Sequence, residues 1–314
     1  MIVPLILAGG IGSRLKPIST SERPKPFHDF IGDGKTLFEA TVIRAQQVSP
    51  VTPIVVVSKH HLNWVRASLE KLSITAHILL EPCGRNTAPA ITCAALMARE
   101  LYGEVPALLT LAADHHIGEI DYFARKICEA HSKEQNKKLT LFGVQPTYPE
   151  TGYGYIQTDE SNHVVAFHEK PDPSTAQCYL DSGDYLWNSG FFLFPISTLL
   201  HELQHHAPEL MKVCITSYTA RQSISMHIQM LANSFQDAAN ISIDHALLER
   251  SKNLTICRYQ GIWSDLGTWK SLYHLWPKES NGNAINNALN LEIISCDKSF
   301  KLLKNGSFIA DVQG

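Results

Sequence analysis

The stretch Ile2-Val3-Pro4-Leu5-Ile6-Leu7-Ala8-Gly9-Gly10-Ile11-Gly12-Ser13-Arg14-Leu15 decides the fold. It opens with a continuous apolar run, which predicts a strand buried on both faces. Three glycines within four residues then free the backbone to turn its N–H groups toward a ligand. Arg14 follows at once, and Lys25 lies further on between two prolines. Backbone donors and two cations beyond a first strand predict a polyphosphate site.

Other interpretations of this region fit less well. The dinucleotide fingerprint G-x-G-x-x-G would need a third glycine where Leu15 stands. Gly34-Lys35-Thr36 resembles the end of a Walker loop, but Asp29 occupies the position of its leading glycine, and no strand directly precedes it. A glycine-rich turn that only connects two elements stays open, although it does not explain the clustered cations.

Composition narrows the class of protein. The chain has 314 residues, 44% of them apolar, which is enough for one large α/β domain with an appendage or for two ordinary domains. A net charge of −3 argues against a nucleic-acid or membrane surface, so any basic site must be local. Seven scattered cysteines without C-x-x-C spacing suit reduced thiols, and the short N-terminal apolar run lacks a basic n-region. We therefore expect a cytoplasmic protein.

Strand and helix patterns alternate through the first half of the chain. Five apolar runs predict strands, at 2–7, 54–57, 78–80, 107–111 and 139–144. Helical patterns lie between them, at about 37–48, 62–72, 88–101 and 122–131. This alternation predicts an α/β fold with a Rossmann-like, mostly parallel sheet and helices on both faces.

In such a sheet, ligands gather at the carboxyl ends of the strands. The loops at those ends carry unusually polar sequences, after Leu7, Leu80, Leu111 and Val144. The agreement between the predicted edge and the polar residues supports both the fold and the location of the site.

After about residue 150 the pattern changes. Residues 153–158 and 164–168 predict an antiparallel pair joined by 159–162, followed by a short helix near 174–180 and a buried strand at 187–194. Helical segments are expected over much of 196–250, including 242–248, with a strand at 254–259. From residue 280 an Asn/Gly-rich tail begins, with β-like pieces near 290–295 and 307–312. We predict one domain over 1–279 and a short β-rich tail over 280–314.

Several side chains on these loops have both a chemical and a structural explanation. Asp114 follows a predicted strand and, with Asp265, would suffice for a magnesium ion bound to phosphates, although an N-cap role is an equal alternative on sequence alone. Glu169-Lys170 offers a hydroxyl acceptor beside a cation, or simply a solvated charge pair. Asn188, within an apolar strand, suits a ligand contact or a buried structural hydrogen bond.

His201-Glu202-Leu203-Gln204-His205 matches the zinc-protease pattern H-E-x-x-H. The extended form of the motif asks for Gly and His where this chain has Pro208 and Met211. We therefore interpret these histidines, like the pairs at 60–61 and 115–116, as structural.

Taken together, the motifs resemble one family, the sugar-1-phosphate nucleotidylyltransferases, and within it the bacterial mannose-1-phosphate guanylyltransferases. The resemblance runs from residue 2 to about 275. It covers the stretch Leu7–Leu15, which holds the three glycines and is called the glycine loop below, together with Pro24-Lys25 and further blocks in the family's order. These blocks are Glu81-Pro82 with Arg85–Pro89, Ala113-Asp114-His115, Gly152–Ile156, Glu169-Lys170-Pro171, Trp187–Phe194, Ser242-Ile243-Asp244 and Asp265–Trp269. Arg85-Asn86-Thr87-Ala88-Pro89 points to the guanylyl branch.

The chain also departs from this branch. Lys16, Pro26 and Ala112 stand where tryptophan, glutamine and proline are common, which leaves the exact substrates less certain without removing a charged catalytic position. Many members carry a C-terminal phosphomannose isomerase domain, and the tail here resembles only the start of the connector to it. If the chain is complete, it should lack isomerase activity.

The resemblance implies transfer of GMP from GTP to mannose 1-phosphate, giving GDP-mannose and pyrophosphate with Mg²⁺ as cofactor. It assigns catalytic charge to Arg14 and Lys25 and the metal to Asp114 and Asp265. Nucleotide contacts are expected from Leu7, Ala8, Gly9, Gly10, Gly12, Ser13, Glu81, Arg85, Asn86, Thr87 and Asp114. Sugar-phosphate contacts are expected from Gly154, Glu169, Lys170 and Asn188.

Other functions remain compatible with the sequence. A uridylyl-, thymidylyl- or adenylyltransferase would use the same catalytic groups with a different base pocket. A non-catalytic protein that binds nucleotide sugars would keep the fold but lose the cations or the metal ligands. A homodimer is compatible with the sequence, and we expect neither a nucleic-acid nor a membrane partner.

Overall fold

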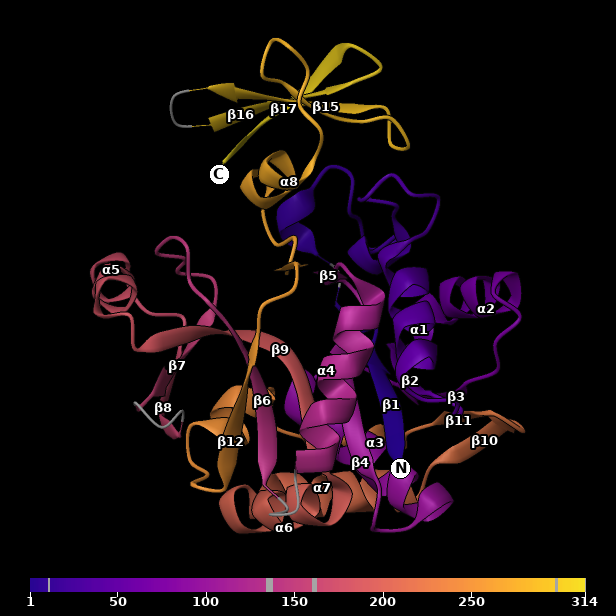
Figure 1. Cartoon of the computed structure of the whole chain (residues 1–314). Helices are drawn as coiled ribbons and strands as arrows, with labels where there is room; N and C mark the ends of the chain where they lie inside the picture. The colour runs from indigo at the N-terminus through magenta and orange to yellow at the C-terminus, as the bar shows by residue number, and fades with distance from the viewer. Residues whose placement is uncertain (11, 134–137, 160–162, 297–298, 314) are drawn as a thin grey trace.

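The computed structural model describes residues 1–10, 12–133, 138–159, 163–296 and 299–313, so Ile11 and part of the predicted 159–162 connection lie outside the described residues. An eleven-stranded sheet forms its centre (Figure 1). Nine strands run in the order β10-β11-β3-β2-β1-β4-β9-β6-β12, and β7 and β8 form an arm beside β9. The strands of the first half are β1 (Ile2–Leu7), β2 (Ile54–Ser58), β3 (His77–Glu81), β4 (Ala107–Ala112) and β6 (Leu139–Val144).

Strand β1 lies in the middle of the sheet, because its residues are apolar on both faces. It pairs in parallel with β2 on one side and with β4 on the other. In this register Leu7 lies opposite Val56 and Ala112. The glycine loop after Leu7 and the Ala113–Asp114 turn after β4 therefore begin side by side at the carboxyl edge of the sheet.

Helices cover both faces, which confirms the predicted fold class. On one face, α1 (Leu37–Val48), α2 (Leu62–Lys71) and α4 (Ile120–Lys133) pack on side chains such as Ile6. On the other, α3 (Thr87–Tyr102), α6 (Ile196–His206) and α7 (Pro208–Thr219) pack on side chains such as Leu5. Alternate residues of β1 thus serve two separate hydrophobic cores, as expected for a strand buried on both sides.

The second half of the chain adds antiparallel strands. The long strand β9 (Tyr185–Pro195) runs antiparallel to both β4 and β6 and so separates them. The arm of β7 (Gly154–Thr158) and β8 (Val164–Glu169) pairs with the start of β9, and α5 (Pro173–Ser182) connects β8 to β9. At the far edge, β12 (Leu254–Tyr259) runs parallel to β6.

The prediction of helices over much of 196–250 was correct only in part. Residues 222–230 form the hairpin β10 (Gln222–Ser225) and β11 (Ile228–Met230), and β11 extends the sheet by pairing with β3. These strands are short; Ile228 and Met230 of β11 reach the core beside distant β3, whereas Ile224 of β10 is exposed. The segment predicted as a helix at 242–248 is a short π-helical turn over Asp244–Leu248.

A separate ribbon of two short strands lies near the carboxyl edge. Strand β5 (His116–Ile117) pairs antiparallel with β13 (Trp263–Ser264), with Ile117 opposite Trp263 and His116 opposite Ser264. A further backbone hydrogen bond runs from Gly118 N to Ile262 O. Neither strand is long enough to be recognised from an apolar pattern.

The tail forms a four-stranded antiparallel sheet, the yellow strands in Figure 1. Its strands are β14 (Ala284–Asn286), β15 (Leu291–Cys296), β16 (Ser299–Lys304) and β17 (Ser307–Gln313), preceded by α8 (Trp269–Leu275). Their core is shared with Leu15, Phe30 and Leu266. The Trp276 indole and the Asn286 side-chain amide both donate to the Phe30 carbonyl, at 2.6 and 3.0 Å.

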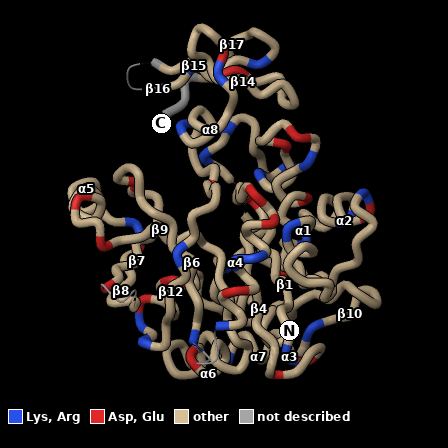
Figure 2. The backbone as a smooth tube through the Cα atoms, viewed as in Figure 1, with Lys and Arg blue, Asp and Glu red and all other residues tan. Residues whose placement is uncertain are grey.

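Acidic and basic positions are interspersed along the whole backbone rather than gathered in one-sign stretches (Figure 2). Among the described residues, none of the helices has the length and apolar character needed to cross a membrane.

Candidate active site

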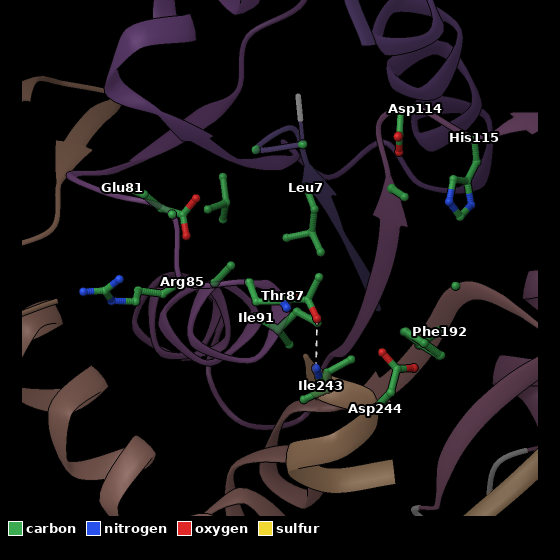
Figure 3. A pocket seen from close by; sticks show the side chains of 18 of the residues that line it. Leu7, Glu81, Arg85, Thr87, Ile91, Asp114, His115, Phe192, Ile243 and Asp244 are labelled. Atoms are coloured by element: carbon green, nitrogen blue, oxygen red, sulfur yellow. Dashed lines mark hydrogen bonds between the residues drawn. The ribbon is translucent and has the colours of Figure 1, made fainter. Parts of the chain in front are cut away.

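A cavity of about 380 Å³ opens at the carboxyl edge of the sheet. The glycine loop, the end of β3, the start of α3, the turn after β4 and the middle of β9 surround it (Figure 3). Nine of the residues predicted from sequence line it: Leu7, Gly9, Gly10, Glu81, Arg85, Asn86, Thr87, Asp114 and Asn188. The remaining predicted residues lie outside this lining.

Gly12 shows why the loop contains glycine. Its φ of +72° lies in the left-handed region, and a Cβ there would collide with the side chain of Lys25. The backbone of the loop therefore packs directly on Lys25. Gly9 lies against the other wall of the cavity, where a Cβ would meet Glu81 Oε2 at 3.3 Å.

Lys25 is a buried cation that joins two acidic segments. Its side chain is 4% exposed, and Nζ donates to Asp114 Oδ2 at 2.9 Å. The same Nζ donates to the backbone carbonyl of Asp265. The short 3-10 helix η2 (Lys25–Phe27) begins at Lys25 after Pro24, whose fixed φ directs the chain inward. Lys25 thus ties the turn after β4 to the turn after β13.

Asp265 is held on three sides. Its Oδ1 accepts hydrogen bonds from Gly267 N at 2.7 Å and from the Tyr153 hydroxyl at 2.9 Å. Arg14 Nη2 lies 3.8 Å from Oδ2, although the Arg14 side chain is 61% exposed and solvent screens this pair. Burial and the neighbouring carboxylate raise the pKa of Tyr153 well above its ordinary value, so its hydroxyl stays a donor. The structure therefore brings Arg14, Lys25, Asp114 and Asp265 into one cluster.

Asp114 stays ionised in this cluster. Burial acts to raise its pKa, but the Lys25 ammonium holds the pKa of Asp114 below its ordinary value. Two nearby carboxylates are hard oxygen donors of the kind that Mg²⁺ prefers, and Mg²⁺ bound to phosphates usually takes only one or two of them. Asp114 and Asp265 therefore fit the predicted metal role.

No group of three or more metal-binding side chains occurs among the described residues. In the H-E-x-x-H segment, Glu202 accepts a hydrogen bond from the Ser251 hydroxyl at 2.6 Å and lies 3.4 Å from His206 Nε2. The segment lies on α6, which begins beside the amino end of β4 and lies at the bottom of Figure 1.

Glu81 is the most unusual ionisable group of the cavity. Its side chain is buried, and Oε1 has no hydrogen-bond partner among the described residues. Desolvation raises the pKa of Glu81 to about 7. Such a carboxyl group is ready to accept hydrogen bonds from a ligand that supplies N–H donors.

This raised pKa predicts a pH-dependent cost to stability. The folded protein holds the proton of Glu81 up to about pH 7, whereas a glutamate in an unfolded chain has an ordinary pKa of 4.5, so stability falls as pH rises through this window. We expect Glu81→Gln to melt at a higher temperature than the wild type at pH 8. Each kcal/mol of gain in unfolding free energy corresponds to roughly 2–4 °C. The advantage should shrink as pH falls toward 5. The exposed Glu22→Gln is the control, and an equal shift at pH 5 and pH 8 would contradict the prediction.

The predicted sugar-phosphate residues lie around one polar corner. Asn188 Nδ2 donates to Asp244 Oδ1 at 2.9 Å, and Asn188 Oδ1 accepts from Gly190 N at 3.2 Å. Burial and, to a smaller extent, Glu169 raise the pKa of Asp244 to about 6. Lys170 Nζ lies 2.5 Å from Glu169 Oε1, and Gly154 pairs with Glu169 across the β7–β8 arm. A Cβ on Gly154 would meet Glu169 Oε2 at 2.6 Å, so a larger residue there would displace the end of this side chain.

Residues 85–87 line the cavity, but their side chains have different orientations. The Arg85 guanidinium donates to the Gln236 carbonyl and points away from the cavity (Figure 3). Asn86 caps α3 with φ at +65°, and its Oδ1 accepts from Thr87 N. Thr87 Oγ1 accepts from Ile243 N at 2.8 Å, which ties the start of α3 to the wall that carries Asp244.

Two polar cavity residues were not among the predicted site residues. His115 is enclosed between Gly190 and Trp263, and burial lowers its pKa, so the ring stays neutral. Asp244 points into the cavity from the short π-helical turn (Figure 3). Both lie in blocks that resemble the family, but neither has a local pattern that reveals its orientation.

A glycine loop, a buried cation and two carboxylates at the carboxyl edge of a mostly parallel sheet define a nucleotide-binding α/β protein. The chain belongs to the nucleotidyl transferase family, whose model matches residues 3–281.

Similar proteins support the same assignment. A mannose-1-phosphate guanylyltransferase of Escherichia coli is 37% identical over 294 residues, which is 91% of this chain and 62% of that protein. Xanthan biosynthesis protein XanB of Xanthomonas campestris pv. campestris (strain B100) is 38% identical over 287 residues, 90% of this chain and 61% of that protein. The chain thus spans about three fifths of the length of these curated relatives.

A solved structure has the same fold. The structure titled mannose-1-phosphate geranyltransferase, from Thermus thermophilus, matches with a TM-score of 0.76 at 28% identity, covering 89% of this chain and 80% of that one.

Proposed function

We propose that this chain transfers GMP from GTP to mannose 1-phosphate, forming GDP-mannose and pyrophosphate. The observation that carries the proposal is the position of Lys25, which joins Asp114 and Asp265 directly beside the glycine loop. This arrangement gathers positive charge and metal-binding oxygens where the phosphates of a nucleotide would lie. The names of the relatives support mannose 1-phosphate as the acceptor.

The reaction needs no covalent enzyme intermediate. A phosphate oxygen of mannose 1-phosphate attacks the α-phosphorus, the bond to the bridging oxygen of the β-phosphate breaks, and pyrophosphate leaves with that electron pair. Lys25 and Arg14 would neutralise charge that builds up on the phosphates, and the loop backbone would donate hydrogen bonds to them. Mg²⁺, held by Asp114 and Asp265, would supply further neutralisation of the phosphate charge when bound.

The unpartnered oxygen of Glu81 supports guanine as the base. Guanine presents two adjacent donors, N1–H and N2–H₂, that a carboxylate can accept side by side. Uracil and thymine present only one such donor, flanked by carbonyl acceptors that a carboxylate repels. The position of Glu81 at the glycine-loop side of the cavity therefore favours a guanylyl donor.

Turnover with a panel of substrates tests the proposal. GTP, UTP, dTTP and ATP are each combined with mannose 1-phosphate, glucose 1-phosphate and fucose 1-phosphate, and pyrophosphate release is measured. We expect the GTP and mannose 1-phosphate pair to have the highest kcat/KM, by about tenfold or more, which corresponds to roughly 1.4 kcal/mol of discrimination. A higher value for another pair, or no product from any pair, would overturn the assignment.

A further inference from the structure

The β5–β13 ribbon connects the two turns that carry the carboxylates. Asp114 comes two residues before β5, and Asp265 directly follows β13. The ribbon has few backbone hydrogen bonds and stands apart from the main sheet, so its own pairing gives it little rigidity. Lys25 ties the two turns that carry Asp114 and Asp265, and Ile117 packs in the core on that face, but the polar backbone of the ribbon needs a further support if the two carboxylates are to keep one separation.

Arg44 of helix α1 contacts this ribbon. It is 2% exposed and belongs to α1 on the face that packs toward α4. Nη2 donates to the Ile117 carbonyl of β5 at 3.3 Å, and Nη1 donates to Thr41 Oγ1 at 3.2 Å. The guanidinium lies over the Phe123 ring, 5.8 Å from its centroid.

Burying the charged guanidinium of Arg44 costs free energy. Arg44 forms no ion pair with any carboxylate among the described residues, and its Nε has no hydrogen-bond partner among them. Burial lowers the pKa of Arg44 to about 10, so the group still carries its charge at neutral pH. A buried charge without a carboxylate partner costs stability, and an apolar residue of similar volume would be tolerated as well or better. Stability alone therefore does not explain Arg44.

We propose that Arg44 is a positioning residue that anchors the β5–β13 ribbon to α1 and thereby fixes the separation of Asp114 and Asp265. Helix α1 is a firm anchor, because Thr36 and Glu39 close a capping box at its start, with both hydrogen bonds at 3.1 Å. The guanidinium fork bridges this helix and the Ile117 carbonyl, which a single ammonium cannot do equally well. The inference rests on the proposed function for the role of the two carboxylates.

Binding of Mn²⁺, followed by electron paramagnetic resonance of the free ion, tests this role without relying on turnover. The titration uses the full chain with and without α,β-methylene-GTP, for the wild type, Arg44→Met and Arg44→Lys. We expect Arg44→Met to bind Mn²⁺ more weakly by about tenfold or more, the usual effect of losing a group that orients metal ligands. Arg44→Lys, which keeps the charge but not the fork, should lose affinity to a smaller extent.

Val42→Ala is the matched control, because Val42 is a fully buried residue of the same helix that belongs to the core on that face. It should lower the melting temperature but leave Mn²⁺ affinity within about twofold, a change of roughly 0.4 kcal/mol.

Unchanged or tighter Mn²⁺ binding by Arg44→Met would overturn the proposal, since removal of a nearby positive charge alone favours a cation. If the wild type binds Mn²⁺ but turns over no substrate pair, the proposed function fails while the anchoring of the two carboxylates is still decided by the variants.

Discussion

Lys25→Ala is expected to lower turnover by about 10²–10³-fold, the scale for one lost electrostatic contact to a transition state. Lys25 is the buried cation of the site, and its Nζ reaches both Asp114 Oδ2 and the Asp265 carbonyl. Without Lys25, the two carboxylates would repel the negative charge that builds up on the α-phosphate and on the departing pyrophosphate, and less positive charge would offset this repulsion. The measurement is kcat for pyrophosphate release at saturating substrates.

Two further variants separate catalysis from folding. Lys25→Met keeps much of the apolar stem that packs on Gly12, so its loss of turnover should be similar with a smaller change in melting temperature. Lys35→Ala removes a partly exposed lysine that pairs with Asp33 at 3.2 Å and should leave turnover unchanged. Near-wild-type kcat in both Lys25 variants would remove Lys25 from the mechanism.

Asp265→Asn is expected to raise the magnesium concentration needed for half-maximal activity by about tenfold or more, because a neutral amide is a poorer ligand for a hard cation. The amide oxygen can still accept from Gly267 N and the Tyr153 hydroxyl, so the turn should keep its shape. Activity is followed across a magnesium titration at fixed substrate concentrations.

Asp121→Asn, which removes an exposed carboxylate from α4, is the control for a general change in net charge. Its magnesium titration should superimpose on that of the wild type. The same half-maximal concentration in Asp265→Asn would contradict a metal role for Asp265. Lys25→Ala should lower kcat without raising the magnesium requirement, so the two substitutions have different signatures.

Much of the fold could be predicted because its strongest signals are local. The apolar run at 2–7 became β1, and the helical pattern at 37–48 became α1 with the same bounds. Strand 254–259 also matched β12. The continuous apolar run of β1 agrees with its burial on both faces, and the apolar positions of α1 agree with its buried side, so local pattern and tertiary packing point to the same structure.

The elements that escaped prediction depend on distant partners. Strand β11 of the β10–β11 hairpin joins the sheet by pairing with distant β3, and the β5–β13 ribbon joins segments about 150 residues apart. The burial of Arg44 could not be predicted from the sequence, because an arginine in an amphipathic helix is normally exposed to solvent. Its burial follows from the packing of α1 against α4, which no local pattern encodes.

The site shows the same division. The carboxyl-edge rule agrees with the cavity for the loops after Leu7, Leu80 and Leu111, since parallel strands end at one edge, whereas the loop after Val144 supplies only Tyr153, which donates a hydrogen bond to Asp265. It could not say which way a side chain turns: Arg85 faces away from the cavity toward Gln236, while Asp244 faces into it. Rotamers of this kind are selected by neighbours from other parts of the chain.

The core shared by the tail sheet and the glycine loop has a practical consequence for chimeric proteins. Leu15 and Leu266 are the chain neighbours of Arg14 and Asp265, and both belong to the buried cluster that contains Ile293 and Leu302 of the tail. A tail transplanted from a relative would therefore have to bring matching partners for Leu15, Phe30 and Leu37, or the graft would shift the very turns that carry the charged side chains. The two ends of the sequence should be exchanged as a set.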